Sequence, residues 1–413
     1  MPPVEIVNRA YATDGDVHHY ESIALQLRAG DLPYRDFAFE YPPLALVPIG
    51  IAALAIDDFQ DAFRLVMLVI SAVGIALVAL ILARTGAGRT RLFAACVGIA
   101  LAPLALPTAF FERIDPWPAV LLLGAVAAFT YNRPVLTAGM LAAGTLAKIF
   151  PAATLPAVVL AGRRERSAIA RDFVFFAAIV VLVLLPFVIV GRAGAEQAVS
   201  TLARRPLHVE SLGGSALLWL HQLGLYDARV YGSFGGSQDL AGTLAAAVAI
   251  VQGAAVVVAV VLAWLLFARG PRSTEHALTA TAASVLALVA FGKVLSPQFL
   301  VWVVFVVALV ERRLFARGFV LVAAALVLTR AYFPYRYDDL VALEGHVVWI
   351  PLLRNLVLVA LTAYLVTSLR STESRATVSE GRAEERAAPP RVAPERHSAG
   401  RRSLVRFPRR ERR

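Results

Sequence analysis

Apolar runs, separated by short polar turns that carry arginine, recur along most of the chain. A helix needs about 20 apolar residues to cross the hydrocarbon core of a bilayer. Each run is therefore predicted to cross a membrane, and the shorter runs are expected to be tilted or broken. The predicted fold is an all-α polytopic bundle. Its eleven expected crossings are residues 62–84, 92–110, 117–131, 134–147, 149–162, 172–191, 241–268, 275–292, 297–311, 315–330 and 348–367.

One further apolar segment, residues 43–56, is short and begins with two prolines. We interpret it as a helix at the membrane interface that does not cross. Three regions follow. Residues 1–61 are expected to be a first extracytoplasmic loop with this interface helix, residues 62–367 the transmembrane bundle, and residues 368–413 a disordered, Arg-rich tail.

The distribution of arginine predicts the orientation of the bundle. Alternate loops carry the cations, and cytoplasmic loops are enriched in Lys and Arg. The loop arginines are Arg84, Arg89, Arg91, Arg133, Arg163, Arg164, Arg166, Arg171, Arg269, Arg272, Arg312, Arg313 and Arg317. These loops and the tail are therefore placed in the cytoplasm of a multi-pass plasma-membrane protein. Eleven crossings then leave residues 1–42 outside the cell, so we expect one N-terminal helix to be missing from this chain.

Composition supports the membrane interpretation and narrows the chemistry. Hydrophobic residues make up 59% and charged residues 17% of the 413 residues, and the mean hydropathy is +0.69, which excludes an ordinary soluble domain. The net charge of +11 does not indicate nucleic-acid binding, because residues 368–413 alone supply +7. Cys96 is the single cysteine, which excludes an intrachain disulfide and a cysteine-based metal site. No metal or other cofactor is expected.

The chemistry-bearing side chains lie in the segments assigned to the outer face. The first segment holds the carboxylates Asp14, Asp16, Asp31, Asp36 and Glu40, interleaved with Tyr34, Phe37, Phe39 and Tyr41. A solvated loop with an interfacial aromatic belt has this composition too. Its three prolines favour a rigid, functional geometry instead.

Cations in the later outer segments each have two interpretations. Arg113 either pairs with Asp115 or binds phosphate, and Lys148 either extends to the interface or meets an anion. The loop that contains RRPLHVESL (204–212) either docks over the bundle or lies on the surface. Arg354, inside the last crossing, either pairs with an acid or contacts a ligand.

Several strings resemble the polyprenol-phosphate-mannose-dependent mannosyltransferases of glycosyltransferase family 87. They are GDLPYRDFAFEYPP (30–43) after Asp16-Val17-His18-His19-Tyr20, KIFP (148–151), VESL (209–212), KVLSPQF (293–299) and Arg354-Asn355. The resemblance covers residues 12 to 367. It implies the GT-C membrane fold and transfer of a sugar, usually mannose, from a polyprenyl-phosphate donor. The acceptor would be a glycolipid or glycan hydroxyl on the outer face of the plasma membrane, typically in an actinobacterial envelope.

The resemblance also implies a catalytic carboxylate in the first outer loop. Asp16 matches that position best, and Asp14, Asp36 and Glu40 are alternatives. Such a carboxylate takes the proton of the attacking hydroxyl, and cations stabilise the leaving phosphate, so that transfer inverts the anomeric configuration. The expected phosphate-binding residues are Lys148, Lys293, Arg330 and Arg113. The expected sugar- or acceptor-binding residues are Tyr34, Phe37, Tyr41, Ser296, Gln298 and Tyr332.

Three competing functions remain at this point. A transporter or flippase for a lipid-linked sugar needs polar residues at mid-membrane depth, of which Arg354 is the nearest example. Another GT-C transferase, such as an arabinosyltransferase, shares the same features. A non-catalytic envelope assembly protein would bind the donor lipid without turning it over.

Overall fold

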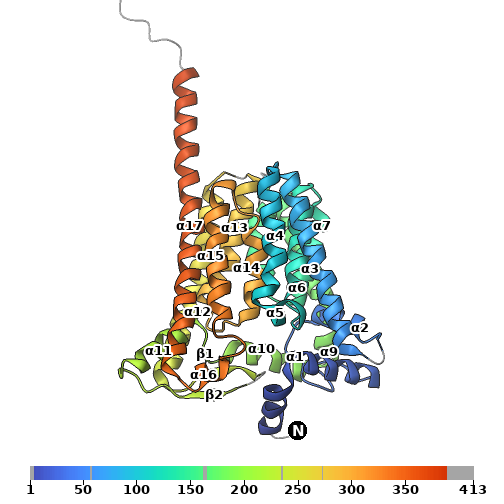
Figure 1. The fold of residues 1–413 in the computed structure, drawn as a ribbon. Helices are drawn as coiled ribbons and strands as arrows, with labels where there is room; N and C mark the ends of the chain where they lie inside the picture. The colour runs from blue at the N-terminus through green and yellow to red at the C-terminus, as the bar shows by residue number, and fades with distance from the viewer. Residues whose placement is uncertain (1–3, 56–57, 161–164, 234–235, 272, 388–413) are drawn as a thin grey trace, which may run out of the picture. The chain divides into compact units, whose positions relative to one another are not determined.

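The computed structural model of the chain describes residues 4–55, 58–160, 165–233, 236–271 and 273–387, with side chains described from residue 16 to residue 370 except Leu160. The chain divides into two compact units, Met1–Glu373 and Ser374–Arg413. The first unit contains a bundle of antiparallel helices, which confirms the predicted membrane-protein class (Figure 1).

Ten helices build the bundle within the described residues. They are α3 (Phe59–Arg84), α4 (Arg89–Ala105), α6 (Pro116–Thr130), α7 (Pro134–Ala147), α9 (Arg166–Val190), α12 (Thr243–Arg269), α13 (Thr274–Phe291), α14 (Leu300–Val307), α15 (Arg312–Arg330) and α17 (Gly345–Ala387). Five of the described helices are long and apolar enough to span a membrane: α3, α9, α12, α13 and the Gly345–Arg370 part of α17. The count of eleven crossings stays a prediction.

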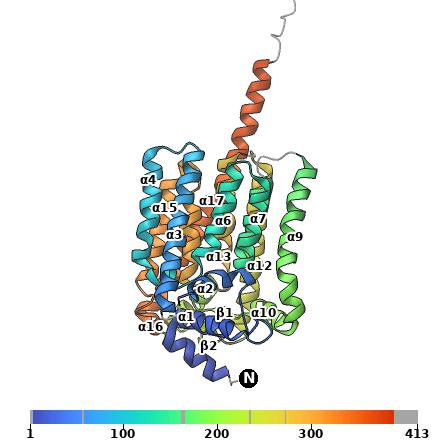
Figure 2. The ribbon, with the colours of Figure 1, turned by 90° about the vertical axis from the view of Figure 1, so that its right-hand side faces the viewer.

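The helix α9 shows why a membrane is required. It lies at the edge of the bundle (Figure 2), and its side chains Leu182 and Ile189 are 73% and 71% exposed. Apolar surface of this extent is stable only against lipid or another protein. The helix α13, in contrast, is buried on nearly every face, and its Thr281 and Ser284 hydroxyls donate to carbonyls one turn back.

Close helix contacts in the core depend on small residues. A Cβ at Gly74 of α3 would lie 2.8 Å from the ring of Phe305 on α14, so only glycine lets these helices approach so closely. Two predicted crossings consist of short pieces. Residues 149–162 contain the 3-10 helix η2 (Phe150–Thr154) and α8 (Leu155–Leu160), and residues 297–311 contain η4 (Pro297–Phe299) and α14.

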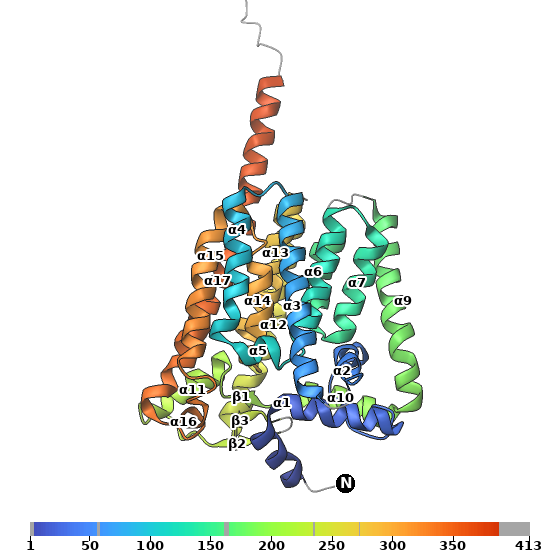
Figure 3. The same ribbon diagram turned by 45° about the vertical axis from the view of Figure 1, so that its right-hand side comes forward.

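The two ends of the bundle differ. Short turns that contain or adjoin arginines join α3 to α4, α6 to α7 and α14 to α15 at one end. At the other end, which we call the loop end, lie the longer segments (Figure 3). The elements of the loop end are α1 (Val4–Ala29), η1 (Pro43–Ala45), α2 (Leu46–Ala52), α5 (Pro107–Phe111), α10 (Arg192–Arg204), β1 (Leu207–His208), α11 (Leu212–Gln222), β2 (Val230–Gly232), β3 (Gln238–Leu240) and α16 (Tyr337–Val341).

Three features add detail to the expected regions or depart from them. Residues 4–29, part of the expected first extracytoplasmic loop, form the helix α1, which is not among the five candidate spans. The expected disordered tail is helical up to Ala387, and residues 388–413 lie outside the described residues. A small antiparallel sheet in the order β1-β3-β2, with Leu207 paired to Leu240, departs from the all-α expectation.

The segment 43–56 is helical from residue 43 to residue 52. Pro43 is the first residue of η1. The backbone nitrogen at this position makes no hydrogen bond within the helix, so a proline is tolerated there. The segment packs on α3 and α7, so it fixes the first outer segment against the bundle. That position brings the aromatic and acidic residues before it to the loop end.

Candidate active site

Asp16, the expected catalytic carboxylate, lies on α1 and forms an ion pair with Arg113. Arg113 follows α5 in the turn before α6, and the two side chains are 19% and 27% exposed. Burial lowers the pKa of Arg113 to about 10, while the charges of Asp115 and Glu210 act in the opposite direction. The ion pair of Arg113 therefore forms with Asp16 rather than with Asp115, its near neighbour in the sequence.

Asp115 instead pairs with Lys148. The Nζ atom of Lys148 lies 2.8 Å from Oδ1 of Asp115, which is 1% exposed. The ammonium also lies over the rings of Phe299 and Trp302, both at 5.2 Å, and of Tyr41, at 5.6 Å. Lys148 thus meets an anion, as one of the two interpretations expected, and that anion belongs to the protein. The second oxygen of Asp115, Oδ2, is buried without a hydrogen-bond partner among the described residues.

Of the alternative carboxylates, Glu40 lies beside these groups. Burial raises the pKa of the half-buried Glu40, and the nearby charges of Arg205 and Lys148 partly oppose that shift. Asp36 is engaged locally, because it accepts from the backbone N–H of Leu32 at 2.8 Å and pairs with Arg35 at 2.7 Å. The side chain of Asp14 lies outside the described residues.

The aromatic residues of the first outer segment differ in burial and in what they contact. Tyr34 is 8% exposed, adopts a φ of +68°, and donates its hydroxyl to the carbonyl of Tyr41 at 2.5 Å. Its ring packs edge-on against Phe39 and Phe187, so Tyr34 holds the segment in place, and its contact with a sugar stays a prediction. Phe37 is half-buried and accepts a backbone bond from Tyr34. Tyr41 lies beneath the Lys148 ammonium.

The loop with VESL docks onto the bundle, as one of its two interpretations expected. Glu210 is 1% exposed, and its carbonyl accepts from Arg354 Nη2 at 2.7 Å and from Asn355 Nδ2 at 2.9 Å. Its carboxylate oxygen Oε1 accepts from the Tyr332 hydroxyl at 2.5 Å. Burial raises the pKa of Glu210 to about 7, against the opposing charges of Arg354 and Arg113. Tyr332 is fully buried in this contact, and its predicted role in binding sugar stays a prediction.

The remaining predicted residues lie between α13 and α14 and at the end of α15. Lys293 donates to the carbonyl of Ala203 at 2.8 Å. Ser296 begins η4, and the Oε1 atom of Gln298 is buried without a hydrogen-bond partner in the described structure. Arg330 stacks on the ring of Tyr335, which is 79% exposed. Arg330 therefore lies against an exposed side chain rather than in the buried cluster of Glu40, Asp115 and Lys148.

A cavity of about 440 Å³ opens beside Lys293. It is enclosed by the loop that precedes β1, by β2 and β3, and by the first turns of α12. The polar residues on its wall include Arg205, Lys293 and Tyr231, and the apolar residues include Leu207, Ala249 and Ile250.

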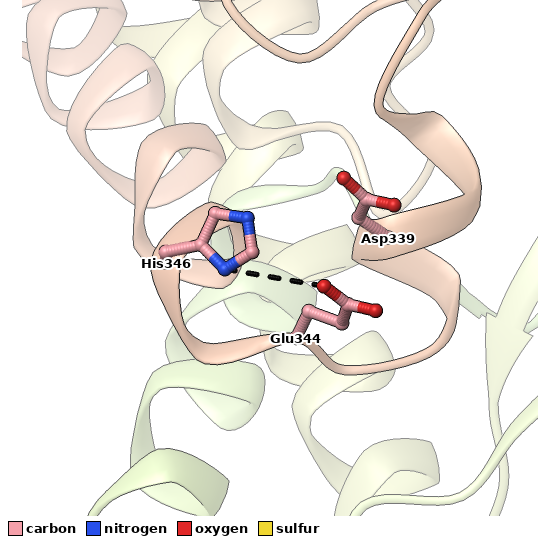
Figure 4. Close-up of side chains that lie close together, drawn as sticks. All are labelled: Asp339, Glu344 and His346. Atoms are coloured by element: carbon pink, nitrogen blue, oxygen red, sulfur yellow. Dashed lines mark ion pairs between the residues drawn. The ribbon is translucent and has the colours of Figure 1, made fainter.

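One group of side chains among the described residues has the spacing of metal ligands. Asp339, Glu344 and His346 bring one ligand atom each to within 4.8 Å of one another (Figure 4). Glu344 and His346 are 51% and 58% exposed and lie 4.0 Å apart, and Asp339 pairs with Arg336. Their contacts are those of surface ion pairs, which contribute little free energy.

Sequence reasoning did not select three residues that the structure places at the loop end. Asp115 was considered only as a partner of Arg113, and Glu210 only as part of a motif. Arg205, whose charge faces Glu40 and Lys293, was not selected at all. One signal in the sequence could have indicated Arg205. It directly follows Arg204 and precedes Pro206 in an outer segment, where arginine is not needed to hold the chain on the cytoplasmic side.

Comparison with protein families gives one match. The sequence model of glycosyltransferase family 87 matches residues 39–297, which is more than half of the chain. The matched range contains the Glu40, Arg113, Asp115, Lys148, Arg205, Glu210 and Lys293 side chains described above. Comparison with curated proteins and with solved structures gives no match.

Proposed function

Because the chain belongs to glycosyltransferase family 87, we propose that it moves a sugar, mannose, from a polyprenyl-phosphate donor to a hydroxyl of a glycolipid or glycan. The observation that carries this proposal is the convergence of paired carboxylates and cations at one end of an apolar helical bundle. Asp16 with Arg113, and Asp115 with Lys148, come from α1, the α5–α6 turn and the end of α7.

Asp16 is the proposed general base. A carboxylate close to an arginine stays ionised at neutral pH, which a base requires. The acceptor oxygen forms a bond to the anomeric carbon of the sugar while its proton passes to Asp16. The bond between that carbon and the phosphate oxygen breaks on the opposite face, so the anomeric configuration inverts. The transition state resembles an oxocarbenium ion, as in glycoside hydrolysis.

Glu40 is the alternative base that the geometry favours over Asp36. Its burial raises its pKa and so makes it the stronger base when ionised. Asp36 is less suited, because its carboxylate already accepts from Leu32 and Arg35. The variants Asp16→Asn and Glu40→Gln separate the two assignments.

The leaving group is a lipid phosphate, whose developing charge needs cations rather than a general acid. Lys148, Arg113 and Lys293 at the loop end are the proposed sources of that charge stabilisation. Tyr41, Phe37 and Gln298 are the proposed contacts for sugar or acceptor. Arg354 favours a transferase over a flippase. It donates to the carbonyl of Glu210, so its charged group is used to hold the loop in place rather than to line a path for a lipid-linked sugar through the bundle.

We place this site on the extracytoplasmic face of the plasma membrane. The support is the arginine content of the turns at the opposite end, such as Arg84, Arg89 and Arg133, which the positive-inside rule assigns to the cytoplasm. Residues 1–61 are then the first extracytoplasmic segment, and the tail is cytoplasmic.

The proposal is tested with the purified full chain in liposomes, given radiolabelled polyprenyl-phosphate mannose and a glycolipid acceptor. We expect a labelled glycolipid of inverted anomeric configuration relative to the donor. Transfer from a nucleotide sugar without any lipid donor, or movement of the donor across the bilayer without a glycosidic product, would overturn it. Polyprenyl-phosphate arabinose as a second donor decides the choice of sugar.

A further inference from the structure

The cavity beside Lys293 has a charged end and an apolar wall. The charged end is formed by Arg205, just after α10, and Lys293, just after α13. The apolar wall is formed by residues of the first two turns of α12, Ala246, Ala249 and Ile250. Figure 3 shows that the strands β1, β3 and β2 lie at the loop end, where α12 begins. The cavity therefore lies at the loop end, beside the first turns of a candidate membrane span.

The two cations lie close enough for their charges to repel one another. Burial and the charge of Arg205 together lower the pKa of Lys293. The Nζ atom of Lys293 donates to the carbonyl of Ala203, a neutral acceptor, at 2.8 Å. A carbonyl does not neutralise an ammonium, so an anion in the cavity would relieve the repulsion and accept from both side chains.

The wall of the cavity continues onto the surface that faces lipid. Ile250 is 74% exposed and the neighbouring Val251 68% exposed on α12, one of the five candidate spans. An apolar chain bound to the cavity can therefore run along α12 without leaving the hydrocarbon. A ligand that satisfies both ends has an anionic head and an apolar tail.

We propose that this cavity binds the phosphate group of a single-phosphate lipid between Arg205 and Lys293, with the lipid chain lying along α12. This proposal rests on the proposed function in one respect, that this lipid is the sugar donor. Arg205 also lies near the proposed reaction centre, because its charge acts to lower the pKa of Glu40 and of Tyr41. Lys293 and Arg205 then hold the phosphate as it leaves.

The four residues predicted to bind phosphate differ in what their cationic groups contact. Lys148 and Arg113 are engaged by Asp115 and Asp16, so their charges are largely matched within the protein. Arg330 stacks on an exposed ring. Lys293 donates to a neutral carbonyl, and it lines a cavity of about 440 Å³ with room for a phosphate and several carbons of the chain.

The test measures binding of fluorescent farnesyl phosphate to the full chain in nanodiscs. Replacing Lys293 by Met should raise the Kd about 10- to 100-fold, the equivalent of one charge-assisted hydrogen bond. Lys293→Arg should keep binding within a few-fold of the wild type. Ala249→Phe, which fills the apolar wall, should weaken farnesyl phosphate and farnesol alike, whereas Lys293→Met should leave farnesol unaffected.

Matched controls keep the test specific. Val257→Phe adds the same side chain to an exposed position of α12, and Arg192→Met removes an exposed cation of α10 that pairs with Glu196. Both should bind farnesyl phosphate like the wild type. Unchanged binding in both Lys293→Met and Ala249→Phe overturns the proposal. Competition by millimolar inorganic phosphate as strong as that by prenyl phosphate would show a site for free phosphate and also overturn it.

Failure of the cavity and failure of the proposed function are distinguishable. If the wild type binds farnesyl phosphate in the expected way but transfers no sugar, the cavity assignment stands and the transferase assignment fails. If the wild type transfers sugar, and Lys293→Met and Ala249→Phe do so with unchanged KM for the donor, the cavity assignment fails and the function stands.

Discussion

The ammonium of Lys148 lies 2.8 Å from the buried carboxylate of Asp115 and joins the end of α7 to the start of α6. Three aromatic rings surround this ion pair, so it has little access to water. A buried pair contributes little net stability, but removing one partner leaves an uncompensated charge. This pair therefore fixes the geometry of the loop end.

Removing only the lysine should be costly. We expect Lys148→Met to lower the free energy of unfolding by roughly 3–5 kcal/mol, because Asp115 remains buried and unpaired. The measurement is the midpoint of thermal unfolding of the purified protein in detergent. The double variant Lys148→Met/Asp115→Leu should recover most of the loss, and Arg192→Met, at an exposed pair, should change little. A single variant as stable as the wild type would contradict the role of the pair.

Removing the proposed base should stop catalysis without disturbing the fold. Asp16→Asn is expected to reduce the transfer rate by about 10²- to 10⁴-fold, the range of a general base. The measurement uses labelled polyprenyl-phosphate mannose in membranes, with donor binding determined in parallel. Asp36→Asn, at the surface turn, is the control and should keep most of the activity. If Asp16→Asn is active and Glu40→Gln is not, the base is Glu40.

The stability of the protein should depend on pH through Glu210. Burial raises the pKa of Glu210 from 4.5 to about 7, so the folded state holds a proton that the unfolded state has already lost. The stabilising contribution is complete below pH 4.5 and is lost as the pH rises through 7, to a total of about 3 kcal/mol. His208 has the opposite effect on the pH dependence of stability. Burial lowers the pKa of His208 to about 3, so its stabilising contribution is present above pH 6.5 and is lost as the pH falls.

Glu210 and His208 both make the stability depend on pH, so the contribution of Glu210 is measured as the difference in stability between the wild type and a variant that lacks this carboxyl group. Unfolding midpoints of the wild type and of Glu210→Gln are compared between pH 5 and pH 8. The glutamine keeps an oxygen that accepts from the Tyr332 hydroxyl but does not titrate. We expect the wild type to lose stability relative to the variant as the pH rises. A difference that does not change with pH would show that Glu210 does not titrate in this range.

Chelation should leave catalysis unchanged. The expected mechanism stabilises the leaving phosphate with cationic side chains, and the Asp339–Glu344–His346 group is largely exposed and engaged in surface pairs. Transfer assayed in EDTA should equal transfer without it, and His346→Ala should be as active as the wild type. Activity that EDTA removes and magnesium or manganese restores would contradict this prediction.

The orientation of the bundle can be measured directly. After Cys96→Ser, a new cysteine at Ala38 in the loop end should react with a membrane-impermeant maleimide in intact cells. A cysteine at Thr90, an exposed residue at the opposite end, should react only after the cells are broken. Reaction of the Thr90→Cys protein alone in intact cells would place the loop end in the cytoplasm and reverse the proposed topology.

The apolar runs determined the class of the fold and the position of most helices. This was achievable from sequence because the length of a run and the arginines beside it are local properties, and a bilayer imposes a fixed thickness. The same local reasoning did not predict the helices at residues 4–29 and 371–387, where the composition is polar. Alanine, arginine and glutamate form helices well, and composition alone does not decide between a helix and a loop.

Only the tertiary structure decided which charges meet. Asp16 pairs with Arg113, Asp115 with Lys148, and the Glu210 carbonyl with Arg354, each across distant parts of the chain. Spacing along the sequence left open whether Arg113 pairs with Asp115 or binds phosphate. Whether two side chains meet depends on how helices pack and where they end, and helix packing is set by the summed contacts of the whole bundle. The cavity between Arg205, Lys293 and α12 exists for the same reason, because three separate segments enclose it.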